Sequence, residues 1–138
     1  MEKIGIYVQV PFCQTKCTYC NFHTGVVAKA RFAPYVEAVC REIRGHEAFY
    51  AEAGVKLPES LRDAVVDTVY FGGGTPSLLE AGQLEKILVA IGETFGGCGS
   101  GCVEAEGGFL TPRTQRAQRR GFQEVTLEAD PETIEAEK

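Results

Sequence analysis

The sequence of 138 residues has no long apolar run, no excess of positive charge and no apolar block at its start. No stretch approaches the ~18 apolar residues of a membrane-spanning helix, so we expect no membrane span. The formal net charge of -5 argues against nucleic-acid binding as a general property, and leaves room only for a local basic patch. Residues 1–10 alternate apolar and polar side chains where a secretory signal would be continuously apolar. We therefore expect a cytoplasmic protein.

What is present fits one globular domain. The contents of 44% apolar and 24% charged residues are those of an ordinary folded chain, and the length allows one domain at most. Six cysteines in a chain without an export signal are better explained as reduced thiols and metal ligands than as a disulfide framework.

The first half of the chain predicts a strand, a loop and a helix. Residues 3–10 alternate with a period of two and predict a strand that ends before Pro11. Residues 23–31 resemble a linker. Apolar side chains then recur at helical spacing from Phe32 to Tyr50, a helix that Gly45 weakens and Gly54 ends. Cys40 lies on its apolar stripe and is predicted to be core, while His46 is predicted to be a surface or packing histidine.

Two further strands follow. Residues 64–71 are rich in β-branched and aromatic side chains and predict a second strand. The helix after it carries its apolar side chains on one side: Leu84, Ile87, Leu88, Ile91 and Phe95. Residues 124–128 predict a third strand, with Asp130 as the cap of a third helix. Consecutive strand–helix units predict an α/β fold with a parallel sheet and helical crossovers.

Three cysteines beyond the first strand form the pattern C-x3-C-x2-C: Cys13, Cys17 and Cys20. Thiolates this close can converge on zinc, copper(I) or an iron–sulfur cluster. A structural zinc site normally closes with four ligands, whereas a [4Fe-4S] cluster held by three cysteines leaves one iron open. The residues alone also allow three unliganded thiols, or a zinc site with His23 as fourth ligand.

A second motif, Gly72-Gly73-Gly74-Thr75-Pro76-Ser77, ends the second strand. It is either a tight turn that needs positive φ, or a bare backbone that a ligand approaches closely beside the Thr75 hydroxyl. It is not a P-loop, which needs a lysine, and Ser77 replaces the third glycine of a dinucleotide fingerprint. Glu128 and Asp130, at the end of the third strand, are by themselves compatible with a helix cap and a charged neighbour.

The region from 96 to 120 differs in composition from the rest. Residues 96–108 hold six glycines with Cys98 and Cys102, and residues 111–120 are basic. A C-x3-C metal site and an RNA or phosphate contact are both conceivable here. We expect instead a solvated short helix within an insertion, for which the residues suggest no function.

Together these motifs resemble one family. The pattern Y-x-x-x-P-F-C-x-x-x-C-x-Y-C-x-F from Tyr7 to Phe22 resembles the cluster motif of the radical S-adenosylmethionine (SAM) superfamily. Within it, the likeness is to oxygen-independent coproporphyrinogen III oxidases and haem chaperones. The G-G-G-T-P-S element resembles the one that binds the methionine end of SAM, and Glu128-Ala-Asp-Pro resembles the family's E-x-[ND]-P. The resemblance spans residues 4–95 and 122–138.

The resemblance implies the opening of a (βα)6 partial TIM barrel, about three of its units. Residues 1–138 would be one incomplete radical SAM core domain with an insertion at 96–120. A [4Fe-4S] cluster would bind through three irons to Cys13, Cys17 and Cys20, and SAM would chelate the fourth. In the SAM site, Tyr7 would hydrogen-bond near the ligand and Tyr19 would pack beside its adenosyl group or a second ligand. The methionine pocket would be lined by Gly73, Gly74 and Thr75, with Glu128 opposite.

The resemblance also implies the chemistry: the reduced cluster gives an electron to the SAM sulfonium, and the resulting 5′-deoxyadenosyl radical abstracts hydrogen from a substrate. Two departures from the family pattern bear on whether the chain resembles the oxidases or the haem chaperones. Gln9 stands where the family usually has histidine, and Phe22 where oxidases tend to have a further cysteine. Phe22, and the short segment before Tyr7, favour a haem chaperone of tetrapyrrole metabolism. The expected partners are SAM, haem or a porphyrinogen, and an electron donor.

Two alternatives remain. One is an anaerobic oxidase that decarboxylates two propionates of coproporphyrinogen III. The other is a zinc-stabilised module that binds RNA through the basic insertion.

Overall fold

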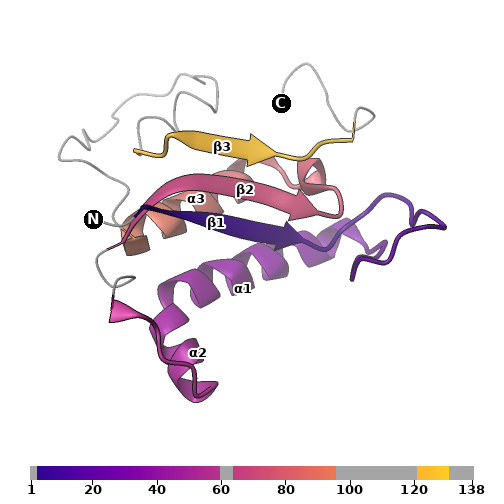
Figure 1. Cartoon of the computed structure of the whole chain (residues 1–138). Coiled ribbons are helices and arrows are strands. Elements are labelled where there is room, and N and C mark those ends of the chain that lie inside the picture. Colours follow the sequence, from indigo (N-terminus) through magenta and orange to yellow (C-terminus); the bar gives the residue numbers. More distant parts are fainter. Residues whose placement is uncertain (1–2, 60–63, 96–120, 131–138) are drawn as a thin grey trace.

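The structure, a computed structural model, describes residues 3–59, 64–95 and 121–130. Within these ranges a parallel sheet carries helices on one face (Figure 1). Its strands, in spatial order, are β1 (Lys3–Val10), β2 (Val65–Gly73) and β3 (Glu124–Leu127). The helices are α1 (Phe32–Arg44), α2 (His46–Glu52) and α3 (Ala81–Phe95), with short 3-10 turns at Lys29–Arg31 and Pro76–Leu78.

Alternation along the strands produces the core. In β1 the side chains of Val8 and Val10 are buried, while Tyr7 and Gln9 point to the other side and are exposed, which confirms the predicted first strand. The buried side chains of β2 are Val66, Val69 and Phe71. They pack with the buried face of α3, formed by Leu84, Ile87, Ala90 and Ile91, and with Phe32, Val36 and Cys40 of α1. The prediction that Cys40 belongs to the core is confirmed.

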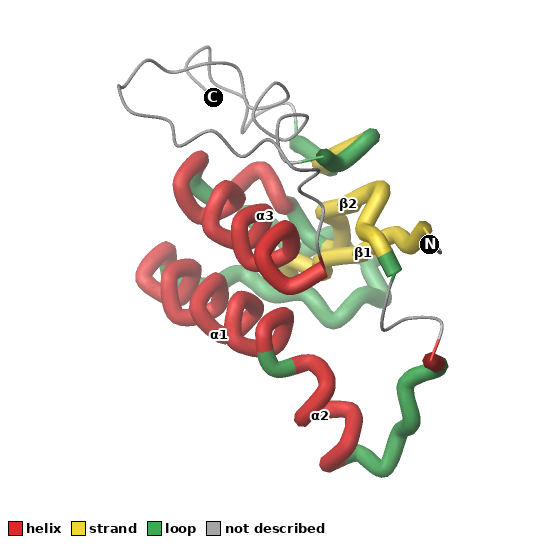
Figure 2. The backbone as a smooth tube through the Cα atoms, turned by 90° about the vertical axis from the view of Figure 1, so that its left-hand side faces the viewer, coloured by secondary structure: helices red, strands yellow, loops and turns green. Residues whose placement is uncertain are grey.

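Both helices lie on the same side of the sheet. Figure 2 shows α1 and α3 side by side, and contacts between them are numerous. The strand order follows the chain order, so each crossover advances in one direction with its helix on one face. This is the winding of a barrel and not of a doubly wound sheet, whose helices cover both faces. The predicted α/β fold with parallel strands and crossover helices is confirmed.

The structure corrects the predicted helix over residues 32–50, which is broken at Gly45. Gly45 has φ -100° and ψ 12°, and it separates α1 from α2. A Cβ at this position would lie 3.1 Å from the Arg41 carbonyl oxygen and 3.3 Å from the Phe49 ring, so the missing side chain lets Phe49 pack close. Gly54, with φ +69°, follows the end of α2, as predicted for the end of this region.

Smaller differences concern the strand ends. β2 runs to Gly73, two residues further than predicted, so that part of the glycine motif belongs to the sheet. The His46 ring packs against the Phe95 ring with their centroids 4.7 Å apart, which confirms the predicted packing role of His46. The expected third helix and the region 96–120, including Cys98 and Cys102, lie outside the described residues. Among the helices that are described, none combines the length and apolar content of a membrane span.

Candidate functional site

The three expected motifs leave the sheet at one edge. β1 pairs with β2 in parallel up to Val10 opposite Gly73, and β2 pairs with β3 up to Phe71 opposite Leu127. The cysteine loop and the glycine turn therefore follow neighbouring strands at their carboxyl ends (Figure 1), and Glu128 directly follows β3. In α/β folds this edge is the usual place for ligands.

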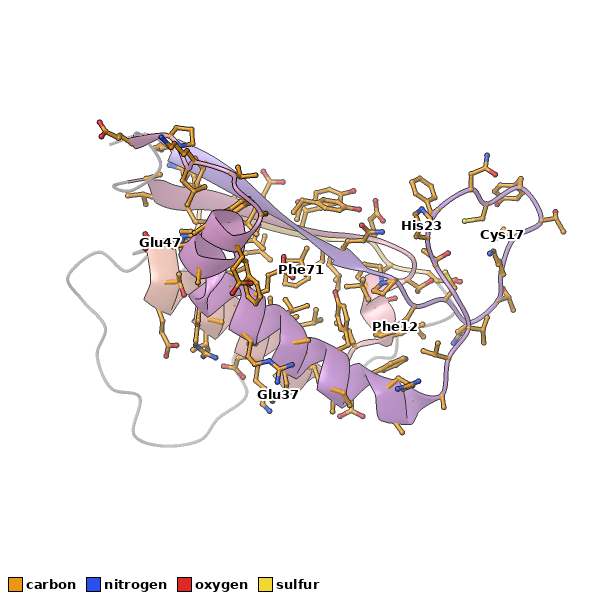
Figure 3. All side chains as sticks on the ribbon, turned by 90° about the horizontal axis from the view of Figure 1, so that it is seen from below. Phe12, Cys17, His23, Glu37, Glu47 and Phe71 are labelled. Carbon is orange, nitrogen blue, oxygen red and sulfur yellow. The ribbon has the colours of Figure 1, made fainter. Side chains whose placement is uncertain are left out.

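The base of the cysteine loop is fixed. The Cys13 amide donates to the Gly25 carbonyl at 3.1 Å, and the Gly25 amide donates to the Pro11 carbonyl at 2.9 Å, so the loop closes on itself. Phe12 is buried, with its ring stacked 4.7 Å from that of Phe32. Figure 3 shows Phe12 near the start of the loop and Cys17 and His23 farther out, where the loop projects beyond the sheet.

The glycine turn is pressed against this base. The Gly74 amide donates to the Val10 carbonyl at 2.8 Å, and the Thr75 amide to the Phe12 carbonyl at 2.6 Å. A Cβ on Gly74 would overlap the Phe12 carbonyl and lie 3.0 Å from Cys13 Sγ. Gly73 has φ +110°, a conformation that side-chain-bearing residues avoid. Glycines are therefore required in the turn, because they let it pack closely against Phe12 and Cys13.

The three thiols differ in exposure. Cys13 and Cys20 are half-buried and Cys17 is exposed. Cys20 Sγ lies 3.7 Å from Thr24 Oγ1, and a hydrogen bond to the Cys17 side chain raises the pKa of Tyr19. Within the described residues, no three His, Cys, Asp or Glu side chains lie close enough together to hold a metal ion. The thiols share one loop without converging on a point, and metal sites commonly form only as the metal binds.

The donor set fits an iron–sulfur cluster in its chemistry. The loop offers three soft thiols within eight residues, and all three are free cysteines. Cys13, the best anchored of them, lies against Gly74, whose bare Cα leaves the space beside this sulfur open.

A polar cluster lies on the sheet face that the described helices do not cover, called the open face below. Tyr70 Oη donates to Glu128 Oε1 at 2.6 Å, and the Gly73 amide donates to Glu128 Oε2 at 3.2 Å. The rings of Tyr7 and Tyr70 stack with centroids 5.7 Å apart and planes 19° apart. A Cβ on Gly72 would lie 2.8 Å from both tyrosines. The hydrogen bond to Glu128 raises the pKa of Tyr70.

The expected site residues thus fall into two groups and one outlier. Tyr7, Gly73 and Glu128 meet in the polar cluster, and Gly74 and Thr75 contact the base of the cysteine loop. The amides of Gly73, Gly74 and Thr75 already donate within the protein, so a ligand at the turn would meet bare Cα atoms and the Thr75 side chain. Tyr19 is 84% exposed, beside Cys17.

Tyr70 is a site residue that lies outside the motifs, and Gly72 belongs to the glycine motif but was not among the expected site residues. The alternation Val69-Tyr70-Phe71 places Tyr70 on the face opposite the core, and Tyr70 is the register partner of Tyr7. That alternation was the available signal. Gln9, in place of the family histidine, is exposed, and its side chain would lie 3.0 Å from a Cβ on Gly73. Gln9 therefore lies at the same edge of the sheet as the glycine turn.

Comparisons with known proteins show what this chain is similar to. No family model matches the chain. The heme chaperone HemW of Synechocystis sp. is 41% identical over 96 residues, covering 65% of this chain and 20% of the relative. Anaerobilin synthase of Escherichia coli O157:H7 is 39% identical over 88 residues, covering 64% and 18%. Oxygen-independent coproporphyrinogen III oxidase of Pseudomonas aeruginosa is 33% identical over 86 residues, covering 62% and 16%.

The chain is a relative of these proteins. The predicted relationship to the coproporphyrinogen III oxidase and haem chaperone group is thereby confirmed. The chain spans about a fifth of the length of the curated relatives it matches. Among solved structures, coproporphyrinogen III oxidase (HemN) from Escherichia coli, described as a radical SAM enzyme, matches with a TM-score of 0.52. At 24% identity, over 68% of this chain and 19% of that one, this match shows the shared fold.

Proposed function

We propose that this chain is part of a radical SAM protein of haem metabolism, from the haem chaperone branch, and that it holds a [4Fe-4S] cluster and SAM. One observation carries the proposal: Cys13, the first thiol of the C-x3-C-x2-C loop, lies against Gly74 of the glycine turn, and that turn also binds Glu128. Three motifs that are separate in the sequence share one edge of the sheet.

The proposed roles follow from these contacts. Cys13, Cys17 and Cys20 would ligate three irons as thiolates. A bound cluster supplies single electrons for the reductive cleavage of SAM. The amides of Gly74 and Thr75 hold the base of the cysteine loop against the sheet. The chain's own contribution is thus to anchor the cysteine loop, and with it the three thiols, at the edge of the sheet.

The SAM site would lie beside the base of the cysteine loop. Gly73, Gly74 and Thr75 offer a surface without bulky side chains for the methionine end of SAM, and Glu128 and Tyr7 offer polar groups. Tyr19, on the exposed part of the loop, would pack beside the adenosyl group or a second ligand. In this proposal residues 1–138 form one incomplete radical SAM core, with residues 96–120 as an insertion.

The remaining parts of the proposal concern partners and place. Haem or a porphyrinogen would be the tetrapyrrole ligand, and a separate donor would supply electrons. The four cysteines of the described residues are free, which suits the reducing cytoplasm. The names of the relatives support tetrapyrrole chemistry, both as heme chaperones and as oxidases.

Anaerobic reconstitution with iron and sulfide tests the cluster. We expect about four irons and four acid-labile sulfides per chain, with an EPR signal in the reduced protein that changes when SAM is added. Cys13→Ala, Cys17→Ala and Cys20→Ala should each lose most of the iron, while Cys98→Ala and Cys102→Ala, outside the motif, should keep it. A colourless protein with one zinc, or an EPR signal indifferent to SAM, would overturn the proposal.

A separate assay is needed to distinguish a haem chaperone from a coproporphyrinogen III oxidase. The chaperone proposal predicts that the purified protein binds haem in an absorbance titration and releases no carbon dioxide from coproporphyrinogen III. Decarboxylation under anaerobic reducing conditions would instead assign the chain to the oxidases, whose P. aeruginosa member is 33% identical to it.

A further inference from the structure

The Glu128 carboxylate is held by two donors from one strand. Tyr70 Oη and the Gly73 amide both belong to β2, and each donates to a different oxygen of this carboxylate, at 2.6 and 3.2 Å. Both oxygens of this carboxylate therefore accept a hydrogen bond from β2. Its orientation on the open face is therefore set by β2, although Glu128 itself follows β3.

Among the residues that the structure describes, no cationic side chain forms an ion pair with the Glu128 carboxylate. The described part of the chain contains four ion pairs, none of which includes Glu128: Lys3–Asp67, Lys29–Glu80, Arg44–Glu93 and Lys86–Glu37. An ionised carboxylate has about four lone-pair positions, and two of these are taken by Tyr70 and Gly73. Acceptor capacity and charge remain for a positively charged ligand.

The hydroxyl of Tyr70 is itself held in place. The Tyr70 ring stacks on Tyr7, its register partner on β1, and Gly72 lies so close to both rings that any side chain there would overlap them. Stacked aromatic rings constrain each other's orientation. The position of the Tyr70 hydroxyl, which donates to Glu128, is thus fixed by β1 and β2 together. A flexible side chain would not hold its donor in one position in this way.

We propose that Tyr70 is a positioning residue, whose hydroxyl fixes the Glu128 carboxylate to receive the cationic group of a ligand on the open face. The proposed function supplies the identity of that ligand, SAM, whose sulfonium and ammonium groups are both cationic. Tyr70 acts through Glu128 and needs no contact with the ligand.

The first test requires no cofactor. Tyr70→Phe keeps the stacked ring and removes only the hydroxyl, and Tyr50→Phe, on α2, does the same to a tyrosine of similar exposure (45% against 38%). In a spectrophotometric titration of the tyrosines, Glu128→Gln should shift one of them to lower pH, and this shift should be absent when Tyr70→Phe is present. A titration that Glu128→Gln leaves unchanged would overturn the coupling.

The second test measures SAM affinity in the cluster-loaded protein by calorimetry. We expect Tyr70→Phe to weaken SAM binding about tenfold, as for a lost hydrogen bond to a charged group, with unchanged iron content. Tyr50→Phe should bind as the wild type does. Adding Tyr70→Phe to Glu128→Gln should weaken binding no further, because coupled residues give non-additive effects.

The outcomes separate this inference from the proposed function. Wild-type SAM affinity in Tyr70→Phe, or additive effects in the double variant, would overturn the positioning role while the proposed function stands. If the loaded wild type binds no SAM, the proposed function fails and the ligand assignment fails with it. In that case the tyrosine titration still decides whether Tyr70 positions Glu128.

Discussion

The two faces of the sheet differ in how far their side chains are exposed. On the face that α1 and α3 cover, Val10, Val66 and Phe71 are at most 1% exposed. On the other face Tyr7 is 57% and Tyr70 38% exposed. Tyr70 and Phe71 are neighbours in the sequence, so one step along β2 separates the core from the candidate site.

This difference shows where the fold is stabilised and where it is available for chemistry. Parallel sheets are normally covered on both faces, and in a barrel the helices cover the outer face while the inner face points to the barrel interior. The winding of β1, β2 and β3 with both helices on one side matches that arrangement. Apolar burial on the helix side can maintain the sheet, and the open side can then carry Tyr7, Tyr70 and Glu128 without contributing much to the core.

The difference between the two faces predicts very unequal losses of stability when the sequence neighbours Phe71 and Tyr70 are truncated. Phe71→Ala removes a fully buried ring and should lower the free energy of unfolding by about 3–5 kcal/mol. Tyr70→Ala loses an exposed ring stack and should cost about 1 kcal/mol. Urea unfolding followed by circular dichroism measures both. Equal losses would mean that the open face is packed as tightly as the core.

A second prediction concerns the junction between the core and the site. Gly74→Ala forces a methyl group into the Phe12 carbonyl and toward Cys13 Sγ, so it should destabilise the protein by about 1–3 kcal/mol and reduce cluster loading. Gly82→Ala in α3 is the matched control: nothing lies within 4 Å of its Cβ, and alanine there should be neutral or stabilising by up to about 1 kcal/mol. Denaturant unfolding and iron content after reconstitution measure the two effects. Normal stability and loading in Gly74→Ala would contradict the close contact.

The sequence predicts the core side of the sheet well, because burial there follows local periodicity. The alternation of β1 and the helical spacing that places Cys40 inside both depend on neighbours a few residues away. The motifs at the strand ends are equally local, and their shared edge follows once the strands are known to be parallel.

One contact that the sequence does not predict depends on distant partners. Tyr70 and Glu128 are 58 residues apart, and their hydrogen bond requires the register of β2 against β3. The break at Gly45 is a local feature that the sequence also does not predict: Phe49, four residues further on, packs close to the glycine, whereas helix propensity alone predicts only a weakened helix.

The smallest expected effect concerns Tyr35, which links the helix layer to the edge of the sheet through a hydrogen bond from its hydroxyl to the Gln9 carbonyl. Burial, followed by the charge of Glu42, raises the pKa of Tyr35 from 10.0 to about 12. The folded state therefore keeps this proton where the unfolded state has lost it, so the contribution to stability is complete below pH 10 and disappears as the pH rises to about 12. Tyr35→Phe should cost about 1 kcal/mol at pH 7. Its unfolding free energy should also fall less steeply than that of the wild type between pH 10 and 12, because the variant has no hydroxyl to ionise. Parallel declines in the two proteins would show that this hydroxyl is as accessible to solvent as one on the open face.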